Sequence, residues 1–134
     1  MKIWHGYGTE HSMNLELIGH FLTASDALKA REAIAVLTGA AELDHADGRL
    51  EYGAPPELFS DRLLEAMSGT GVHSLGHADI EQLLYDAQVE ARDSDVVVRT
   101  DEIEVLAYIK VLIAKGARVE IYSMHDQTDG ASDE

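Results

Sequence analysis

The sequence predicts an α+β fold, and the evidence is the order of its hydropathy patterns. An alternating apolar run at residues 15–21 indicates a strand, and an alanine-rich run with helical spacing follows it. The last third has two short strand patterns around a tight turn, then a second helix and a final strand. With residues 40–85 set aside as a mostly helical insertion, the order is strand, helix, strand, strand, helix, strand. That order is the ferredoxin-like split βαβ pattern.

The first strand and helix are justified by the faces that their apolar residues share. Leu15, Leu17 and Phe21 fall on one face of the strand, because side chains alternate between the two faces. Residues 23–26 offer capping side chains, and Gly39 is expected to end the helix, since glycine is the common left-handed stop. The residues expected at helical spacing on the buried face are Leu28, Ala30, Ile34 and Leu37.

The insertion opens with a turn signal and continues with helical patterns. The Asp-Gly dipeptide at 47–48 predicts a turn between two short extended pieces, at 41–45 and 49–52. Pro56 suits the first position of the next helix, because its missing N–H has no partner there in any case. A shorter helix is expected over about 77–85.

The second main helix is expected over residues 102–115. Asp101 and Glu104 have the spacing of a capping box, and Gly116 follows as a stop signal. The apolar stripe expected to be buried is Ile103, Leu106, Ile109, Leu112 and Ile113.

The four expected strands lie near 15–21, 87–92, 95–100 and 117–123. Right-handed crossovers favour one antiparallel sheet in which the last strand lies beside the first, and the first beside the third. Both main helices then cover the same face of the sheet. The other face is covered by the insertion, covered by a partner subunit, or left open.

This topology brings the two ends of the chain to one edge of the sheet. The first strand starts where the last strand ends, so residues 5–14 should meet residues 124–126 there. Histidines beside carboxylates are the chemistry of acid–base pairs and of divalent metal sites. The candidate ligand-binding residues at this edge are His5, Tyr7, Glu10, His11, Ser12, Asn14, Arg99, His125 and Asp126.

None of these patterns forms a complete catalytic group. No nucleophile stands out, and the spacing of the histidines is not diagnostic of a metal site. We therefore assign no catalytic residue, and the metal, the cofactor and the question of enzymatic activity stay open. The glycines at 6–8 lack the lysine and the following helix of a phosphate-binding loop, so they predict a turn.

The net charge of −15, from 25 acidic and 10 basic residues, is the strongest compositional feature. Such a surface repels phosphate backbones, which argues against nucleic-acid binding, and no apolar run approaches the roughly 18 residues of a membrane helix. The absence of cysteine excludes disulfides and thiolate metal sites and favours a cytoplasmic location. The partners that fit are a basic protein or a second copy in a homodimer. One domain is expected over 1–126, followed by a flexible acidic tail at 127–134.

Both ends of the chain carry distinctive segments. The amino end reads KIWHGYGTEHSMNL, and the carboxyl end reads KGARVEIYSMHD. In these segments the chain resembles a family of small uncharacterised bacterial proteins, a domain of unknown function with no known activity. The resemblance implies no substrate and no catalytic residue.

Two functions from different classes fit these observations. We prefer a protein-interaction or accessory module, because no complete catalytic group is visible. The alternative is a small ligand- or metal-binding protein, or an enzyme, with its site where residues 5–14 meet 124–126.

Overall fold

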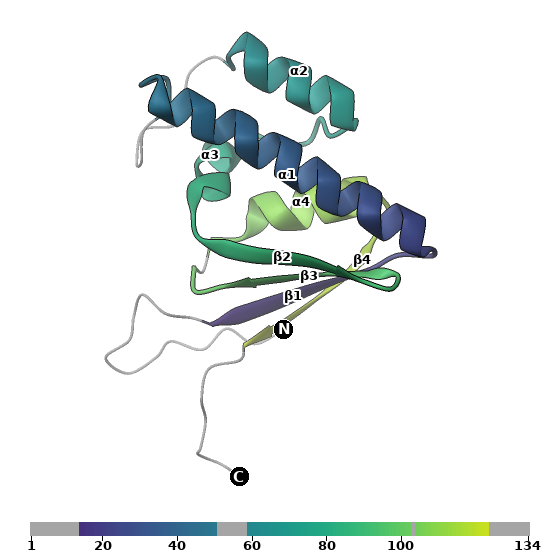
Figure 1. Cartoon of the computed structure of the whole chain (residues 1–134). Helices are drawn as coiled ribbons and strands as arrows, with labels where there is room; N and C mark the ends of the chain where they lie inside the picture. The colour runs from purple at the N-terminus through teal and green to yellow at the C-terminus, as the bar shows by residue number, and fades with distance from the viewer. Residues whose placement is uncertain (1–13, 51–58, 103, 124–134) are drawn as a thin grey trace, which may run out of the picture.

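The computed structural model describes residues 14–50, 59–102 and 104–123 and has an α+β fold. Its strands form one sheet, and helices α1 and α4 lie on the same face of it (Figure 1). The strands are β1 (Leu15–His20), β2 (Ala87–Arg92), β3 (Asp95–Thr100) and β4 (Arg118–Ser123). The helices are α1 (Ala24–Ala46), α2 (Asp61–Thr70), α3 (His77–Ile80), the 3-10 turn η1 (Glu81–Leu84) and α4 (Leu106–Ala114).

The sheet is antiparallel throughout, with the strand order β2-β3-β1-β4. The predicted neighbours are therefore confirmed: the last strand lies beside the first, and the first beside the third. Leu15 pairs with both Thr100 and Ser123, and Thr100 pairs with Ala87. The starts of β1 and β2 and the ends of β3 and β4 thus meet at one edge of the sheet.

The core lies between the sheet and the two main helices. Leu15, Leu17 and Phe21 are buried there, as their spacing predicts. Gly19 lies on the same face, where a Cβ atom would come within 3.1 Å of the Leu112 side chain of α4. The missing side chain therefore lets α4 approach the sheet closely.

Helix α1 is longer than the sequence predicts. It passes through Gly39 and ends at Ala46, so the expected stop at Gly39 and the expected strand at 41–45 are wrong. The continuation buries Ala40, Ala41 and Asp44, and this packing outweighs the cost of about 1 kcal/mol that an interior glycine carries. Leu28 was expected on the buried face, but it is half exposed.

The described part of the second extended piece, predicted at 49–52, is not a strand either. Arg49 and Leu50 are outside any strand, and residues 51–52 lie outside the described residues. His45 Nδ1 instead lies 2.7 Å from the Leu50 carbonyl oxygen, which holds the chain in a turn after the helix.

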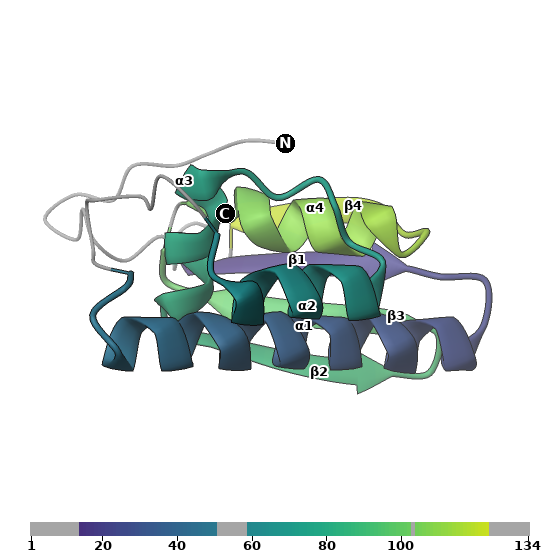
Figure 2. The ribbon, with the colours of Figure 1, turned by 90° about the horizontal axis from the view of Figure 1, so that it is seen from above.

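Helix α2 starts at Asp61 rather than near Pro56, which lies outside the described residues. Its N-cap is Ser60, whose Oγ accepts a hydrogen bond from the Leu63 N–H at 3.0 Å. The same hydroxyl donates to the buried Asp44 of α1 at 2.6 Å, so one serine caps α2 and ties it to α1. Figure 2 shows α2 beside α1 on the helix-covered side of the sheet.

The short helix expected at 77–85 is present as α3 followed by η1, and it buries Ile80 and Leu83. The described part of the insertion is therefore mostly helical, as predicted. It packs on the helix layer, and no helix or strand among the described residues covers the opposite face of the sheet.

Helix α4 starts four residues later than expected, and its N-cap, Val105, makes no side-chain hydrogen bond. The capping box at Asp101 and Glu104 is therefore wrong. The Ala107 N–H donates instead to the Gln82 side chain at 2.8 Å, a long-range contact that local spacing does not reveal.

The buried face of α4 is also rotated from the predicted stripe. Leu106 and Ile113 are about half exposed, and Ile103 lies outside the described residues. The buried residues of α4 are Ala107, Tyr108, Val111 and Leu112. None of the described helices is both long and apolar enough to span a bilayer.

Candidate functional site

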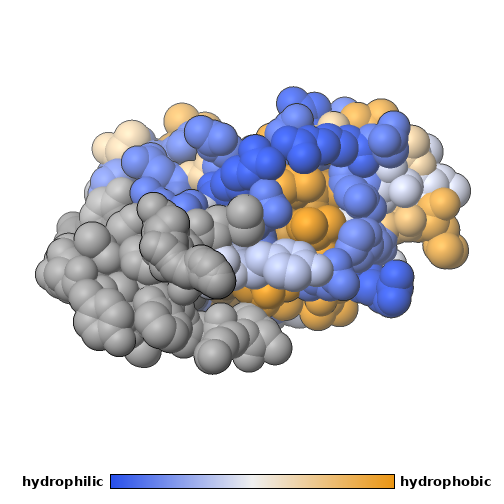
Figure 3. Space-filling view, turned by 90° about the horizontal axis from the view of Figure 1, so that it is seen from below, coloured by the Kyte–Doolittle hydropathy of each residue, from blue (hydrophilic) through white to orange (hydrophobic). Residues whose placement is uncertain are grey.

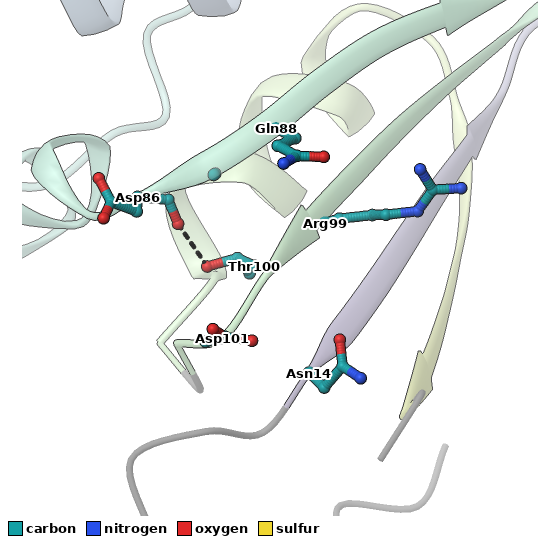
Figure 4. Close-up of a pocket in the computed structure, with 7 residues that line it drawn as sticks. Asn14, Asp86, Gln88, Arg99, Thr100 and Asp101 are labelled. Atoms are coloured by element: carbon teal, nitrogen blue, oxygen red, sulfur yellow. Dashed lines mark hydrogen bonds between the residues drawn. The ribbon is translucent and has the colours of Figure 1, made fainter. Parts of the chain in front are cut away.

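A pocket of about 510 Å³ opens at the edge where the four strand ends meet (Figure 4). We call it the strand-end pocket. It takes residues from the start of β1, the start of β2 and the end of β3. Its lining consists of Asn14, Asp86, Ala87, Gln88, Arg99, Thr100 and Asp101.

Oxygen atoms dominate the chemistry of the strand-end pocket. The Thr100 hydroxyl donates to the Asp86 carbonyl oxygen at 2.8 Å and accepts from the Glu102 N–H at 3.1 Å, which ties the end of β3 to the start of β2. The Arg99 side chain reaches toward β1, where its Nε donates to Glu16 at 2.7 Å (Figure 4). The Arg99 guanidinium in the lining therefore already has a carboxylate partner.

The predicted site residues divide into two groups. Asn14 and Arg99 line the strand-end pocket, as their position at the converging edge suggests. The other seven lie outside the described residues: His5, Tyr7, Glu10, His11, Ser12, His125 and Asp126. Among the residues that the structure describes, no group of three histidine or acidic side chains is placed to hold a metal ion.

Five lining residues were not among the candidates: Asp86, Ala87, Gln88, Thr100 and Asp101. The strand register shows that Gln88 lies at the pocket, because Gln88 of β2 pairs with the candidate Arg99 of β3. Asp101 was assigned to a helix cap instead, since its spacing from Glu104 imitates a capping box.

The face of the sheet opposite the helices carries twelve side chains in three rows across the four strands. We call it the open sheet face. Figure 3 shows apolar atoms near its centre with hydrophilic residues around them. In the order β2, β3, β1, β4, the rows are Gln88, Arg99, Glu16, Tyr122; Glu90, Val97, Ile18, Glu120; and Arg92, Asp95, His20, Arg118.

His20 joins three strands on this face. Its Nδ1 lies 2.9 Å from an Asp95 oxygen, and its Nε2 lies 2.9 Å from a Glu120 oxygen. The hydrogen bonds to Glu120 and then to Asp95 raise the pKa of His20 above its usual value, because both carboxylates favour the protonated ring. In return, the hydrogen bond from His20 lowers the pKa of Glu120.

The arginines form a second group of ion pairs on the open sheet face. Arg99 pairs with Glu16 at 2.7 Å, and Arg92 pairs with Glu90 at 3.1 Å. The hydrogen bond from Arg92 lowers the pKa of Glu90. Across the twelve positions, three arginines stand against four carboxylates, so the face contributes only one of the fifteen net negative charges of the chain.

Comparison with known proteins places the chain in a family but gives it no activity. Residues 1–134 match the model of a family of unknown function, DUF6375. No curated protein and no solved structure matches the chain. The resemblance to an uncharacterised domain family, based on the two ends of the sequence, is thereby confirmed. Because the match covers the full length of the chain, the protein belongs to the DUF6375 family.

Proposed function

We propose that this protein is a protein-interaction module whose open sheet face binds the same face of a second copy. The observation that carries the proposal is the charge balance of that face in a chain of net charge −15. Strong like-charge repulsion opposes association of two such chains almost everywhere else on the surface. The strand order supports the finer assignment of the fold as ferredoxin-like, and the absence of cysteine supports a cytoplasmic location.

A second copy fits the open sheet face better than a basic protein does. A basic partner gains most where acidic side chains are in excess and free to pair. Here the acids are already matched: Glu16 by Arg99, Glu90 by Arg92, and Glu120 by His20. A nearly neutral face with mixed charges and an apolar centre suits self-association.

A two-fold axis parallel to the strands, between β3 and β1, makes the centre of the face complementary to itself. This axis places each strand of the central pair opposite the other strand in the second copy. Arg99 then lies opposite Glu16, Val97 opposite Ile18, and Asp95 opposite His20, as the register of β1 and β3 requires.

The outer strands are less favourable in this arrangement. Glu90 lies opposite Glu120, and Arg92 lies opposite Arg118. These four side chains are at the rim of the contact, where they stay hydrated and their repulsion is screened by solvent and salt. The central pair of strands therefore decides the association.

The size of the face indicates a weak dimer. Four strands about 4.8 Å apart, with six residues at about 3.4 Å each, give a flat footprint of about 400 Å² per copy. The two footprints together, about 800 Å², fall below the ~1,200 Å² of a standard stable interface. We expect dissociation constants between the micromolar and millimolar ranges, set by the quality of the central contacts.

Sedimentation velocity over this concentration range tests the proposal, with Ile18→Glu as the disrupting variant. Val36→Glu is the matched control, because it makes the same change of charge at a half-exposed position on α1, in the helix layer. The average mass should rise with concentration for the wild type and for Val36→Glu but stay monomeric for Ile18→Glu. A wild type that is monomeric at every concentration, or an Ile18→Glu variant that still dimerises, would refute the proposal.

A second candidate function is supported by the strand-end pocket. Its position at the predicted edge, with Asn14 and Arg99 in its lining, fits a site for a small polar ligand or a divalent cation that residues 5–14 and 124–126 would complete. An NMR titration of the full chain with Zn²⁺ tests the cation. Shifts at Asn14 and Asp101 that disappear in the double variant His11→Ala, His125→Ala support a metal site, and unchanged spectra rule out zinc.

A further inference from the structure

A second cavity lies on the helix-covered side of the sheet, away from the open sheet face. We call it the α1–η1 cleft, because α1 and η1 form most of its walls, with the start of β2 and one residue of α4. Its volume is about 490 Å³. It shares only Asp86 and Ala87 with the strand-end pocket.

Tyr108 lines this cleft with a buried hydroxyl that has no partner among the described residues. The residue is only 3% exposed, yet within the part of the chain that the structure describes its hydroxyl makes no hydrogen bond. Buried tyrosine hydroxyls normally find a hydrogen-bond partner, since losing water without replacement is costly. The group facing the cleft is therefore a polar atom still able to bind.

The hydroxyl of Tyr108 is held in its protonated form. Burial, followed by the nearby carboxylates of Glu42 and Asp86, raises its pKa to about 12. It is thus available as a hydrogen-bond donor throughout the neutral pH range.

Two carboxylates near the hydroxyl also have no partner in the part of the chain that the structure describes. Neither the Glu42 nor the Asp86 side chain forms an ion pair or a hydrogen bond with any residue in the described ranges. Arg31 is the one basic residue among the described lining residues, and Glu32 lies beside it at the rim. The cleft therefore has an excess of negative charge that a cation would neutralise.

The walls of the cleft are apolar and leave room for a ligand body. Ile34 of α1 and Leu83 of η1 are both buried in the core beside it. Gly39 of α1 also lines the cleft, and a Cβ atom there would meet nothing within 4 Å. Packing does not require a glycine at this interior helical position, where glycine is unfavourable. Its effect is to open the wall and expose the backbone to the cleft.

We propose that the α1–η1 cleft binds a small apolar ammonium compound. Its ammonium group lies between Glu42 and Asp86, and its apolar body lies against Ile34 and Leu83. The Tyr108 hydroxyl donates a hydrogen bond to an acceptor atom in the compound. This site is independent of the open sheet face, so it does not depend on the proposed dimer.

Three probes with one apolar body separate the parts of this proposal. These are 2-phenoxyethylamine, which carries the ammonium group and an ether acceptor, 2-phenoxyethanol, which is neutral, and phenoxyacetate, which is an anion. Each is titrated into the isotope-labelled full chain and followed by amide chemical shifts. We expect the amine to shift Gly39, Leu83 and Asp86, the alcohol to bind about tenfold more weakly, and the anion to leave these amides unchanged.

Variants test which side chains are responsible. Tyr108→Phe should weaken amine binding about fivefold, because it removes one hydrogen bond of about 1 kcal/mol. Its melting temperature should not fall, since the deleted hydroxyl has no partner in the described part of the chain. Glu42→Gln should weaken the amine but not the alcohol. Glu65→Gln, on the exposed surface of α2, is the matched control and should change neither.

Several outcomes would overturn the proposal. Equal binding of the amine and the anion would exclude recognition of a cation. Unchanged amine affinity in both Tyr108→Phe and Glu42→Gln would place any binding elsewhere. The absence of shifts at Gly39, Leu83 and Asp86 with all three probes at millimolar concentration would show that the cleft does not bind this class of compound.

Discussion

The two faces of the sheet use the same strands for different purposes. Toward the helices, β1 presents Leu15 and Leu17, which are almost fully buried. Toward the other side, it presents Glu16, Ile18 and His20, which are only partly buried and, apart from Ile18, engaged in ion pairs. The alternation of a strand thus places the core on one face and a set of ion-paired side chains on the other.

The largest expected effect comes from neighbouring residues on the two faces. Leu17→Ala should lower the free energy of unfolding by about 2–5 kcal/mol, because it leaves a cavity in the core. Ile18→Ala, one residue away on the open sheet face, should cost less than about 1.5 kcal/mol. Urea denaturation measures both values at low protein concentration, where a dimer would not contribute. Equal losses would mean that the open face is packed as tightly as the core.

Much of this two-faced sheet was predictable from local patterns. The period of two in Leu15, Leu17 and Phe21 identifies the core face, and the crossover rule identifies the neighbouring strands. The edge that carries Asn14 and Arg99 followed from these two facts alone. The positions of strands in a sheet can therefore be predicted from the sequence when the local hydropathy period and the crossover rule agree.

The helices show where local patterns fail. Gly39 and the Asp-Gly pair at 47–48 are standard stop signals, but α1 passes the first because residues beyond it are buried. The start of α4 depends on Gln82, a residue far away in the sequence. Tyr108 lines a cleft walled by α1 and η1 and has no hydroxyl partner among the described residues, which no spacing rule reveals. Tertiary contacts decided these features.

An intermediate effect is expected from two glycines on the helix-covered side. Gly19→Ala should destabilise the protein by about 1–3 kcal/mol, because its Cβ would come within 3.1 Å of Leu112 and 3.3 Å of Ala117. Gly39→Ala should stabilise it by up to about 1 kcal/mol, because alanine is the better helix former and has space. Thermal and urea unfolding measure whether each substitution lowers or raises the stability of the protein. A loss of stability in Gly39→Ala would show that the cleft wall is already filled.

The smallest expected effect is the dependence of the open sheet face on pH through His20. The pKa of His20 is raised in the folded protein, mainly by its hydrogen bonds to Glu120 and Asp95. The folded state therefore binds the proton more tightly than the unfolded state. The stability that results is fully present below the ordinary histidine value of about 6.5, and it is lost as pH rises through the folded pKa.

His20→Gln isolates this contribution, because glutamine keeps a polar side chain without the titration. The difference in melting temperature between wild type and variant should be positive near pH 6 and shrink toward pH 9. It should also shrink in strong acid, since the lowered pKa of Glu120 gives a stabilisation that is lost as pH falls through it. His73→Gln is the control, because His73 is exposed and forms no ion pair within the described ranges, and its difference should stay flat. A flat difference for His20→Gln as well would mean that the two carboxylates give the ring no net preference for its charged form. In that case the pairing of His20 with Asp95 would give the proposed dimer no pH dependence, and the proposal would depend on Ile18, Val97 and the Arg99–Glu16 pair.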